Sequence, residues 1–270
     1  MTAQLDHTER RQFDVPAPSP VTGAQLIARK EAGELLLSVR GLAWLLVVAA
    51  VLSGFALLLV GDTELALLDN AQVVYDMIAV AVAVGALIAV VAGVDAVGGE
   101  RERGSLVPLL LVPLPRAALL AGKLGGLLAA WIATVAITLP YLWAVGSTGQ
   151  NLASGVAAFV VLGTPVVLTF GAFALGLGAR LGSVAGALAA SLTVLVLSGS
   201  PLVIGPGLRR TAIGTAFDLV NPFSAALNAV DAVVIDSEPL LAQTAAFAVT
   251  FAWVLIACWF AWGGVRRLAR

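Results

Sequence analysis

The amino-acid sequence predicts an all-α membrane protein with six transmembrane helices. Of its 270 residues, 60% are hydrophobic and only 11% are charged, whereas soluble domains are about 45–50% apolar and about 25% charged. The mean hydropathy of the whole chain is +1.01, so the apolar residues cannot all lie in one core beneath an ordinary polar surface. The composition therefore excludes a soluble enzyme of this length.

Long uncharged runs place the spans. These runs cover residues 41–61, 77–94, 124–179, 181–208 and 239–265. A helix needs about 20 residues to cross the hydrocarbon core, so the third run is predicted to hold two spans joined by a polar turn at 146–151. The runs are apolar on every face rather than alternating, which favours helices over barrel strands. The predicted spans are residues 42–60, 77–97, 124–145, 153–178, 184–204 and 240–263.

The transmembrane domain is predicted to cover residues 42–264. The segments before and after it are predicted to lie in the cytoplasm. Residues 1–21 contain a Pro-rich stretch and read as a disordered tail, and residues 265–270 form a second tail. We expect no signal peptide, because the first apolar run begins only at Gly41.

Residues 22–41 predict an amphipathic helix on the membrane surface. Thr22 and Gln25 have the spacing of a capping box, which places the start of the helix there and its end near Arg40. Charged side chains gather on one side of this helix, and apolar side chains on the other. A charged flank that only fixes topology is an alternative compatible with the first. The charged side holds Lys30, Glu31 and Glu34.

The distribution of basic residues predicts the orientation of the chain in the membrane. Thirteen of the fifteen lie on one side of the predicted topology, and only Arg209 and Arg210 lie on the other. The positive-inside rule then places both termini in the cytoplasm of a multi-pass protein of the cell membrane. The thirteen are Arg10, Arg11, Arg29, Lys30, Arg40, Arg101, Arg103, Arg116, Lys123, Arg180, Arg266, Arg267 and Arg270.

Several chemistries are missing from the sequence. The middle of every span lacks ionisable residues, which argues against proton-coupled or sodium-coupled transport and intramembrane proteolysis. One cysteine, Cys258, and one histidine, His7, leave no disulfide scaffold, multi-cysteine metal site or Ser-His catalysis. There is no phosphate-binding loop. We expect no catalytic, cofactor or metal residue on this chain and no nucleic-acid partner, so uphill transport would need ATP and Mg on a separate ATPase subunit.

Residues 98–116, between the second and third spans, are the most informative segment. Alternating charges from Glu100 to Arg103 lead through Gly104 to Ser105, which can cap a short helix beginning at Leu106. Pro113 then ends that helix. A short apolar helix with a charged rim is typical of a surface that docks another protein. A charged loop with a flap at the membrane interface is the alternative.

The same segment carries a family resemblance. The stretch Glu100-Arg-Glu-Arg-Gly-Ser-Leu106, then Pro113-Leu-Pro-Arg116, then Gly122-Lys123, resembles the signature of type-2 ATP-binding-cassette (ABC) exporter permeases. Ala28-Arg-Lys-Glu31 resembles the start of that family. Asp95-Ala-Val97 resembles the subgroup with the permease of nitrous-oxide reductase maturation. One departure is Pro108, where the family often has a helix-forming polar or acidic residue, and a proline there bears on the length of the coupling helix.

The resemblance implies a six-helix half-transporter. It would have a connecting helix before the first span, a coupling helix between the second and third, and outer re-entrant or surface helices within 205–239. It implies two ATPase subunits and a second copy of this or a similar permease in the lipid bilayer, and it allows a periplasmic, extracellular or accessory membrane partner. The implied ATPase contacts are Glu100, Arg101, Glu102, Arg103, Gly104, Ser105, Leu106, Leu109 and Leu110, with a secondary contact at Leu181, Gly182 and Ser183.

Two functions follow as hypotheses. The first is a permease that exports a substrate or transmits force to an outer partner; the second is a membrane anchor of a signalling or enzyme-maturation complex without a pathway. A polar track between two copies would separate them, although Ser and Thr in membrane helices more often bond a backbone carbonyl. Uncharged spans favour an amphiphilic or hydrophobic substrate. Candidate pathway residues are Thr134, Thr138, Tyr141, Thr164, Thr169, Ser191, Thr193 and Ser198.

Overall fold

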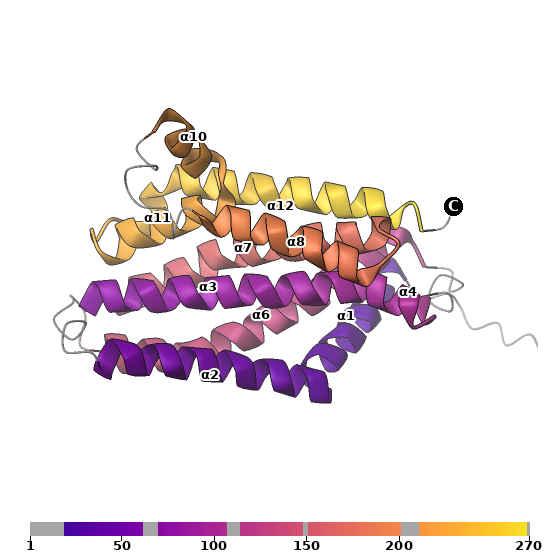
Figure 1. Ribbon diagram of the computed structural model, residues 1–270, viewed down its shortest axis with the longest axis horizontal. Coiled ribbons are helices and arrows are strands. Elements are labelled where there is room, and N and C mark those ends of the chain that lie inside the picture. Colours follow the sequence, from indigo (N-terminus) through magenta and orange to yellow (C-terminus); the bar gives the residue numbers. More distant parts are fainter. Residues whose placement is uncertain (1–18, 62–69, 107–113, 148–150, 201–210, 269–270) are drawn as a thin grey trace, which may run out of the picture.

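A bundle of long helices makes up the protein (Figure 1). The computed structural model describes residues 19–61, 70–106, 114–147, 151–200 and 211–268. Its elements are α1 (Pro20–Leu36), α2 (Val39–Gly61), α3 (Asn70–Val94), the π-helical turn η2 (Asp95–Gly99), α4 (Glu100–Glu102), α6 (Arg116–Gly146), α7 (Leu152–Arg180), α8 (Val184–Gly199), α10 (Ala212–Val220), α11 (Pro222–Val234), the 3-10 turn η4 (Leu240–Ala242) and α12 (Thr244–Val265).

The predicted all-α membrane fold is confirmed. Within the described residues, five helical segments are long and apolar enough to cross a membrane, namely Val39–Leu58, Ala71–Glu102, Arg116–Gly146, Leu152–Arg180 and Thr244–Val265. The sixth predicted span, 184–204, contains α8, an apolar helix of 16 residues. The end of that span, 201–204, lies outside the described residues.

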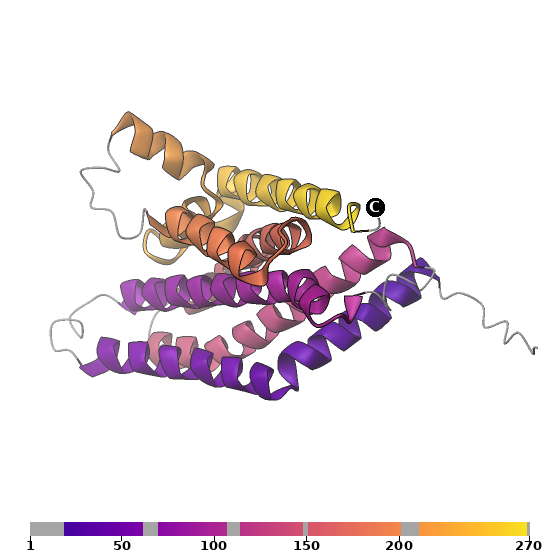
Figure 2. The ribbon, with the colours of Figure 1, turned by 45° about the vertical axis from the view of Figure 1, so that its right-hand side comes forward.

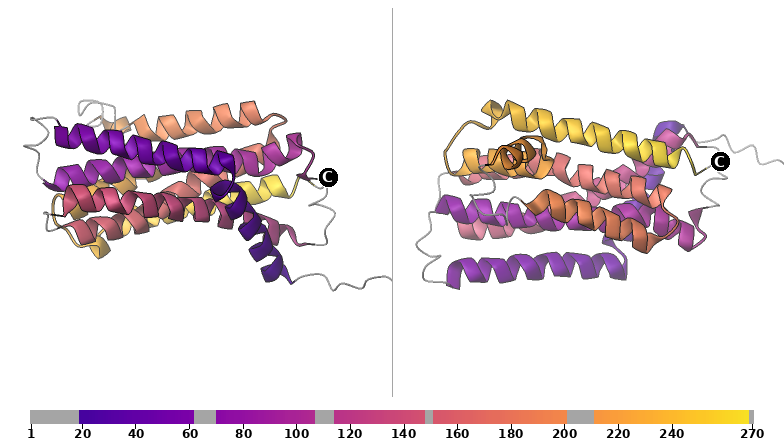
Figure 3. Two further views of the ribbon diagram at one scale, coloured as in Figure 1. Left: turned by 90° about the horizontal axis from the view of Figure 1, so that it is seen from below. Right: turned by 45° about the horizontal axis from the view of Figure 1, so that its top comes forward.

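Helix α7 is the centre of the bundle. It packs along α3 and α12 and also contacts α6, α8 and α11 (Figures 1 and 3). Its side chains Phe159, Leu162 and Val166 have no exposed surface. Glycine lets α3 approach closely, because a Cβ at Gly93 would collide with the carbonyl oxygen of Gly171 on α7. A helix that is apolar on every face is thus surrounded by the others.

Helix α1 leaves the bundle obliquely (Figure 3, left), and its bounds differ from the prediction. It begins at Pro20, with the Ser19 hydroxyl as the cap, because this oxygen accepts the N–H of Thr22 at 3.1 Å. The predicted capping box at Thr22 is therefore wrong. The helix also ends earlier than Arg40. The chain turns at Leu37 and Ser38, where the Ser38 hydroxyl caps α2 by accepting the N–H of Gly41 at 3.0 Å.

The two ends of the bundle hold different elements. Helices α1 and α4, the turn between α7 and α8, and the end of α12 lie at one end, while α10, α11 and the start of α3 lie at the other (Figures 1 and 2). Helix α11 packs its apolar side chains onto α7 and α12, whereas α10 has no buried residue. We call the α4 end the charged end, because the ion pairs of Asp95, Glu100 and Arg103 lie there.

Candidate functional site

A tight turn positions the charged segment Glu100–Ser105 at the end of α3. The π-helical turn η2 continues α3 into α4, and Gly104 then adopts a positive φ of 73°, which favours glycine. The N–H of Ser105 donates to the Glu100 carbonyl at 3.0 Å, and the N–H of Gly104 to that of Arg101 at 3.1 Å. This pair of bonds is the Schellman arrangement that ends a helix. The segment is therefore a defined turn.

Glu100 is buried between two lysines. The exposed fraction of this residue is 3%, and its Oε1 accepts from Lys30 Nζ at 2.8 Å. Its Oε2 accepts from Lys123 Nζ, also at 2.8 Å. Lys123 donates in addition to Glu31 Oε1 at 2.9 Å, and its side chain has no exposed surface. We call Lys30, Glu31, Glu100 and Lys123 the junction cluster; its formal charges cancel.

Glycines on α6 bring the cluster together. Helix α1 crosses the first turns of α6 (Figure 2), and a Cβ at Gly122 would lie 2.5 Å from the Cβ of Ile27. A Cβ at Gly126 would lie 2.5 Å from that of Glu31. Since real Cβ atoms do not approach so closely, only glycine permits this crossing. The close approach is what places Glu31 beside Lys123.

Burial shapes the electrostatics of α1. Burial raises the pKa of the Glu31 carboxyl above its ordinary value, although the ammonium group of Lys123 opposes the shift. The pKa of Lys30 is also raised: burial alone would lower it, but the hydrogen bond and charge of Glu100 outweigh that effect. The two lysines of the cluster thus favour the charged form of Glu31, against the effect of its burial.

The neighbouring charges connect α4 to the turn between α7 and α8. The Arg101 guanidinium donates to the carbonyls of Leu181 at 2.7 Å, Ala179 at 2.9 Å and Gly178 at 3.2 Å. These carbonyls lie at the end of α7, where they lack partners within the helix. Glu102 Oε1 accepts the N–H of Val184, the first residue of α8, at 2.9 Å. The segment thus caps two helices that lie far away in the sequence.

Arg103 folds back onto η2. Its guanidinium binds both carboxylate oxygens of Asp95, at 2.9 and 3.2 Å. A Cβ at Gly99 would collide with this carboxylate, so glycine makes room for the pair. Every charge from Glu100 to Arg103 consequently has a partner inside the chain.

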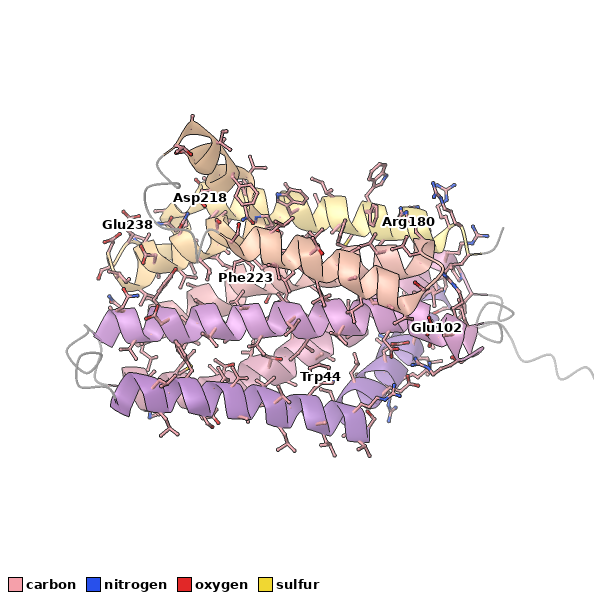
Figure 4. All side chains as sticks on the ribbon, in the orientation of Figure 1. Trp44, Glu102, Arg180, Asp218, Phe223 and Glu238 are labelled. Carbon is pink, nitrogen blue, oxygen red and sulfur yellow. The ribbon has the colours of Figure 1, made fainter. Side chains whose placement is uncertain are left out.

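The two predicted ATPase contacts form one surface. Glu102, Arg103, Gly104 and Ser105 are exposed, and Arg101 bonds to the backbone at the secondary contact, where Leu181, Gly182 and Ser183 are exposed as well. Figure 4 shows Glu102 and Arg180 at this end. Glu100 and Leu106 are buried, so neither side chain is open to a partner here. Leu109 and Leu110 lie outside the described residues.

The candidate pathway hydroxyls mostly bond within their own helices. The hydroxyls of six of them donate to the carbonyl four residues earlier; these residues are Thr134, Thr138, Thr164, Thr169, Ser191 and Thr193. The Tyr141 hydroxyl instead meets Ser53 at 2.7 Å and the Ala49 carbonyl on α2 at 3.2 Å. Ser198 lines an apolar cavity of about 350 Å³ between α7, α8 and α12 at the other end. A pathway between two copies stays a prediction.

A larger cleft borders the junction cluster. Its volume is about 630 Å³, within the usual range of ligand sites. Glu31, Glu34, Arg40, Asp95, Glu100 and Arg103 line its polar end. Trp44 on α2, which Figure 4 labels, belongs to its apolar wall, with Leu45, Ile88, Val91 and Leu188. The cleft is thus polar toward the charged end and apolar toward the middle of the bundle.

Sequence reasoning missed the junction cluster. Glu31 was placed on the solvated side of a surface helix, yet the exposed fraction of this residue is 6%. Lys123 directly precedes the predicted span 124–145, where a lysine is expected to reach water. The one usable signal was that Glu31, Glu100 and Lys123 all fall within the family-like motifs. Nothing in a single sequence pairs three residues so far apart.

Comparison with known families agrees with this architecture. No curated protein matches the chain. Residues 26–266 match the family described as ABC-2 family transporter protein, which is nearly the whole chain. Membership implies a membrane transport subunit that associates with an ABC ATPase. With its apolar spans and its match over this length, the chain belongs to the ABC-2 family of transporter proteins as a multi-pass permease.

Proposed function

We propose that this permease couples ATP hydrolysis by a separate ATPase subunit to export of a substrate, or to force transmission to a partner on the outer side. The observation that supports this proposal is the single exposed surface made by Glu102–Ser105 and Leu181–Ser183. Glu100, just before this surface, is ion-paired to α1 and α6, and Arg101 and Glu102 cap the facing ends of α7 and α8. Because this surface and the residues just before it are bonded to four helices, movement of a docked ATPase would be transmitted to those helices.

The assembly we propose has two permeases and two ATPase subunits. The second permease is another copy of this chain or a similar one, and ATP and Mg bind to the ATPase subunits. The chain itself has no phosphate-binding loop, so hydrolysis needs the partner. The resemblance to the nitrous-oxide reductase maturation subgroup fits the force-transmitting version, in which an outer protein receives the movement.

The cleft beside the junction cluster supports an amphiphilic substrate. Its polar end could meet a charged or hydrogen-bonding head group, while Trp44, Ile88 and Leu188 would contact an apolar body. A purely ionic substrate would gain little from such walls, because burying an ion without a partner is costly.

One observation favours the second function, an anchor without a pathway. Most candidate pathway hydroxyls are already bonded to their own helix backbones, so they offer little to a polar substrate. A scaffold in a signalling or enzyme-maturation complex would still need the exposed surface at the charged end. ATP-dependent efflux from proteoliposomes, or its absence, separates the two functions.

Docking can be tested at Leu181, whose side chain makes no polar contact. We expect Leu181→Asp to weaken copurification with the ATPase, since a charge in the desolvated centre of an interface costs about 2 kcal/mol or more. Leu241→Asp is the matched control, because Leu241 is exposed in η4, just before the start of α12 and away from the charged end. Equal copurification of both variants would place the ATPase elsewhere.

A further inference from the structure

The buried ammonium group of Lys123 is unusual for its position. A lysine near the end of a span normally extends its charge into water. Here the exposed fraction of the side chain is 0%, and the group lies between the carboxylates of Glu31 and Glu100. Buried ion pairs add little net stability, because desolvation offsets their attraction. The value of this arrangement must therefore lie in what it holds in place.

The cluster joins three elements at one point. Glu31 lies on α1, Glu100 on α4 and Lys123 on α6. Both oxygens of Glu100 are used, one by Lys123 and one by Lys30 of α1. A carboxylate bound on both oxygens cannot rotate freely, so it fixes α4 relative to α1 and α6. Arg101 and Glu102 add the turn between α7 and α8.

We propose that Lys123 is a positioning residue for energy coupling. Its ammonium group holds the segment Glu100–Ser105 on α1 and α6, so that movement of this segment carries both helices with it. The inference deepens the proposed function and rests on it, since the movement would come from the docked ATPase. The Lys123 side chain itself has no exposed surface, so its role would be exerted through Glu31 and Glu100.

A positioning role differs from a purely structural one in its response to charge removal. Lys123→Met leaves two buried carboxylates without their shared cation, which should destabilise the protein. The triple variant Lys123→Met, Glu31→Gln, Glu100→Gln removes the unpaired charges, so its thermal stability should recover toward that of the parent. A residue that only stabilises the fold would recover every property in the triple variant. If Lys123 is a positioning residue, the triple variant would recover its stability but not its coupling. Without the bond to Lys123, α4 is still not held on α1 and α6.

Hydrogen exchange of the permease alone, in nanodiscs, gives the first test. In Lys123→Met we expect the amides of Glu100–Ser105 to exchange about a hundredfold to a thousandfold faster, because removing one partner of a buried ion pair is strongly destabilising. The triple variant should keep fast exchange in this segment despite its recovered stability. Amides in the middle of α7 should not change. Arg29→Met, an exposed change on α1, should resemble the parent.

The second test uses the complex with its ATPase. A fluorophore on Asp236→Cys, in a Cys258→Ala background, reports movement at the opposite end of the bundle. We expect ATP to change its signal in the parent complex and in Arg29→Met, but not in Lys123→Met or the triple variant, although both still bind the ATPase.

The outcomes separate the two proposals. Parent-like exchange in Lys123→Met, or an ATP-driven signal restored in the triple variant, would overturn the positioning role. A parent complex without any ATP-driven signal would contradict the proposed function instead. In that case the exchange experiment alone still decides whether Lys123 holds the segment.

Discussion

At the scale of single residues, the charged side chains of the segment Glu100–Ser105 bond to other parts of the same chain. Arg101 illustrates this, because its guanidinium bonds three backbone carbonyls at the end of α7. The planar guanidinium can reach several acceptors at once, which a lysine ammonium on a flexible stem cannot do in the same geometry. The alternating charge pattern therefore reads as a set of internal bonds, each to a different element.

Arg101→Gln tests this interpretation. We expect a loss of about 1–3 kcal/mol, since hydrogen bonds from charged donors contribute roughly that much and buried carbonyls lose their partner. Thermal unfolding in detergent should show the loss, together with faster amide exchange at Val184–Gly186. Arg267→Gln, an exposed change at the same end, is the control and should unfold like the parent. Equal midpoints for the two variants would mean that water replaces the guanidinium.

At the scale of elements, the crossing of α1 and α6 depends on missing side chains. Gly122 and Gly126 lie one turn apart on α6, and each faces a side chain of α1. This is the close helix approach that small residues permit in membrane proteins. The connecting helix is thus packed on the bundle through one face, Gly23, Ile27 and Glu31, rather than lying only on lipid.

Two glycine substitutions should have opposite effects. Gly122→Val puts a branched side chain where the Ile27 side chain already lies, and overpacking of this kind costs about 1–3 kcal/mol. Gly33→Ala adds a methyl group in open space within α1, which should stabilise by about 0.4–1 kcal/mol. Thermal midpoints and the rate of proteolytic cleavage within α1 measure both effects. Rapid cleavage in Gly33→Ala as well would show that the crossing is not what protects α1.

The spans and the junction differ in how far sequence could predict them. Uncharged runs define the spans because a charge in hydrocarbon is costly, and this constraint acts on each segment separately. The prediction placed the N-cap of α1 at Thr22, whereas Ser19 is the cap. Serine and threonine are both good N-cap residues, so local sequence does not decide between them. The junction cluster depends on three segments meeting, and the glycines that allow it signal only a close approach. The periodicity of a single sequence does not show which distant segments pack together, so it could not predict this cluster.

At the scale of the whole molecule, charge is concentrated at one end. The junction cluster, the Arg103–Asp95 pair and the caps of α7 and α8 all lie there, while α10 and α11 cover the other end (Figure 1). The basic residues predict that this charged end faces the cytoplasm, where ATP is available. Both the docking proposal and the coupling proposal require that orientation.

Cysteine labelling decides the orientation. In a Cys258→Ala background, Asp236→Cys presents a thiol on the exposed turn after α11, and Gly182→Cys presents one at the charged end, where a new side chain meets nothing within 4 Å. We expect a membrane-impermeant maleimide to label Asp236→Cys in intact cells and Gly182→Cys only after permeabilisation, because thirteen of the fifteen basic residues are predicted to lie on the side of Gly182. The reverse pattern would place the docking surface outside the cell, away from ATP. The permease could then not be driven through Glu102–Ser105.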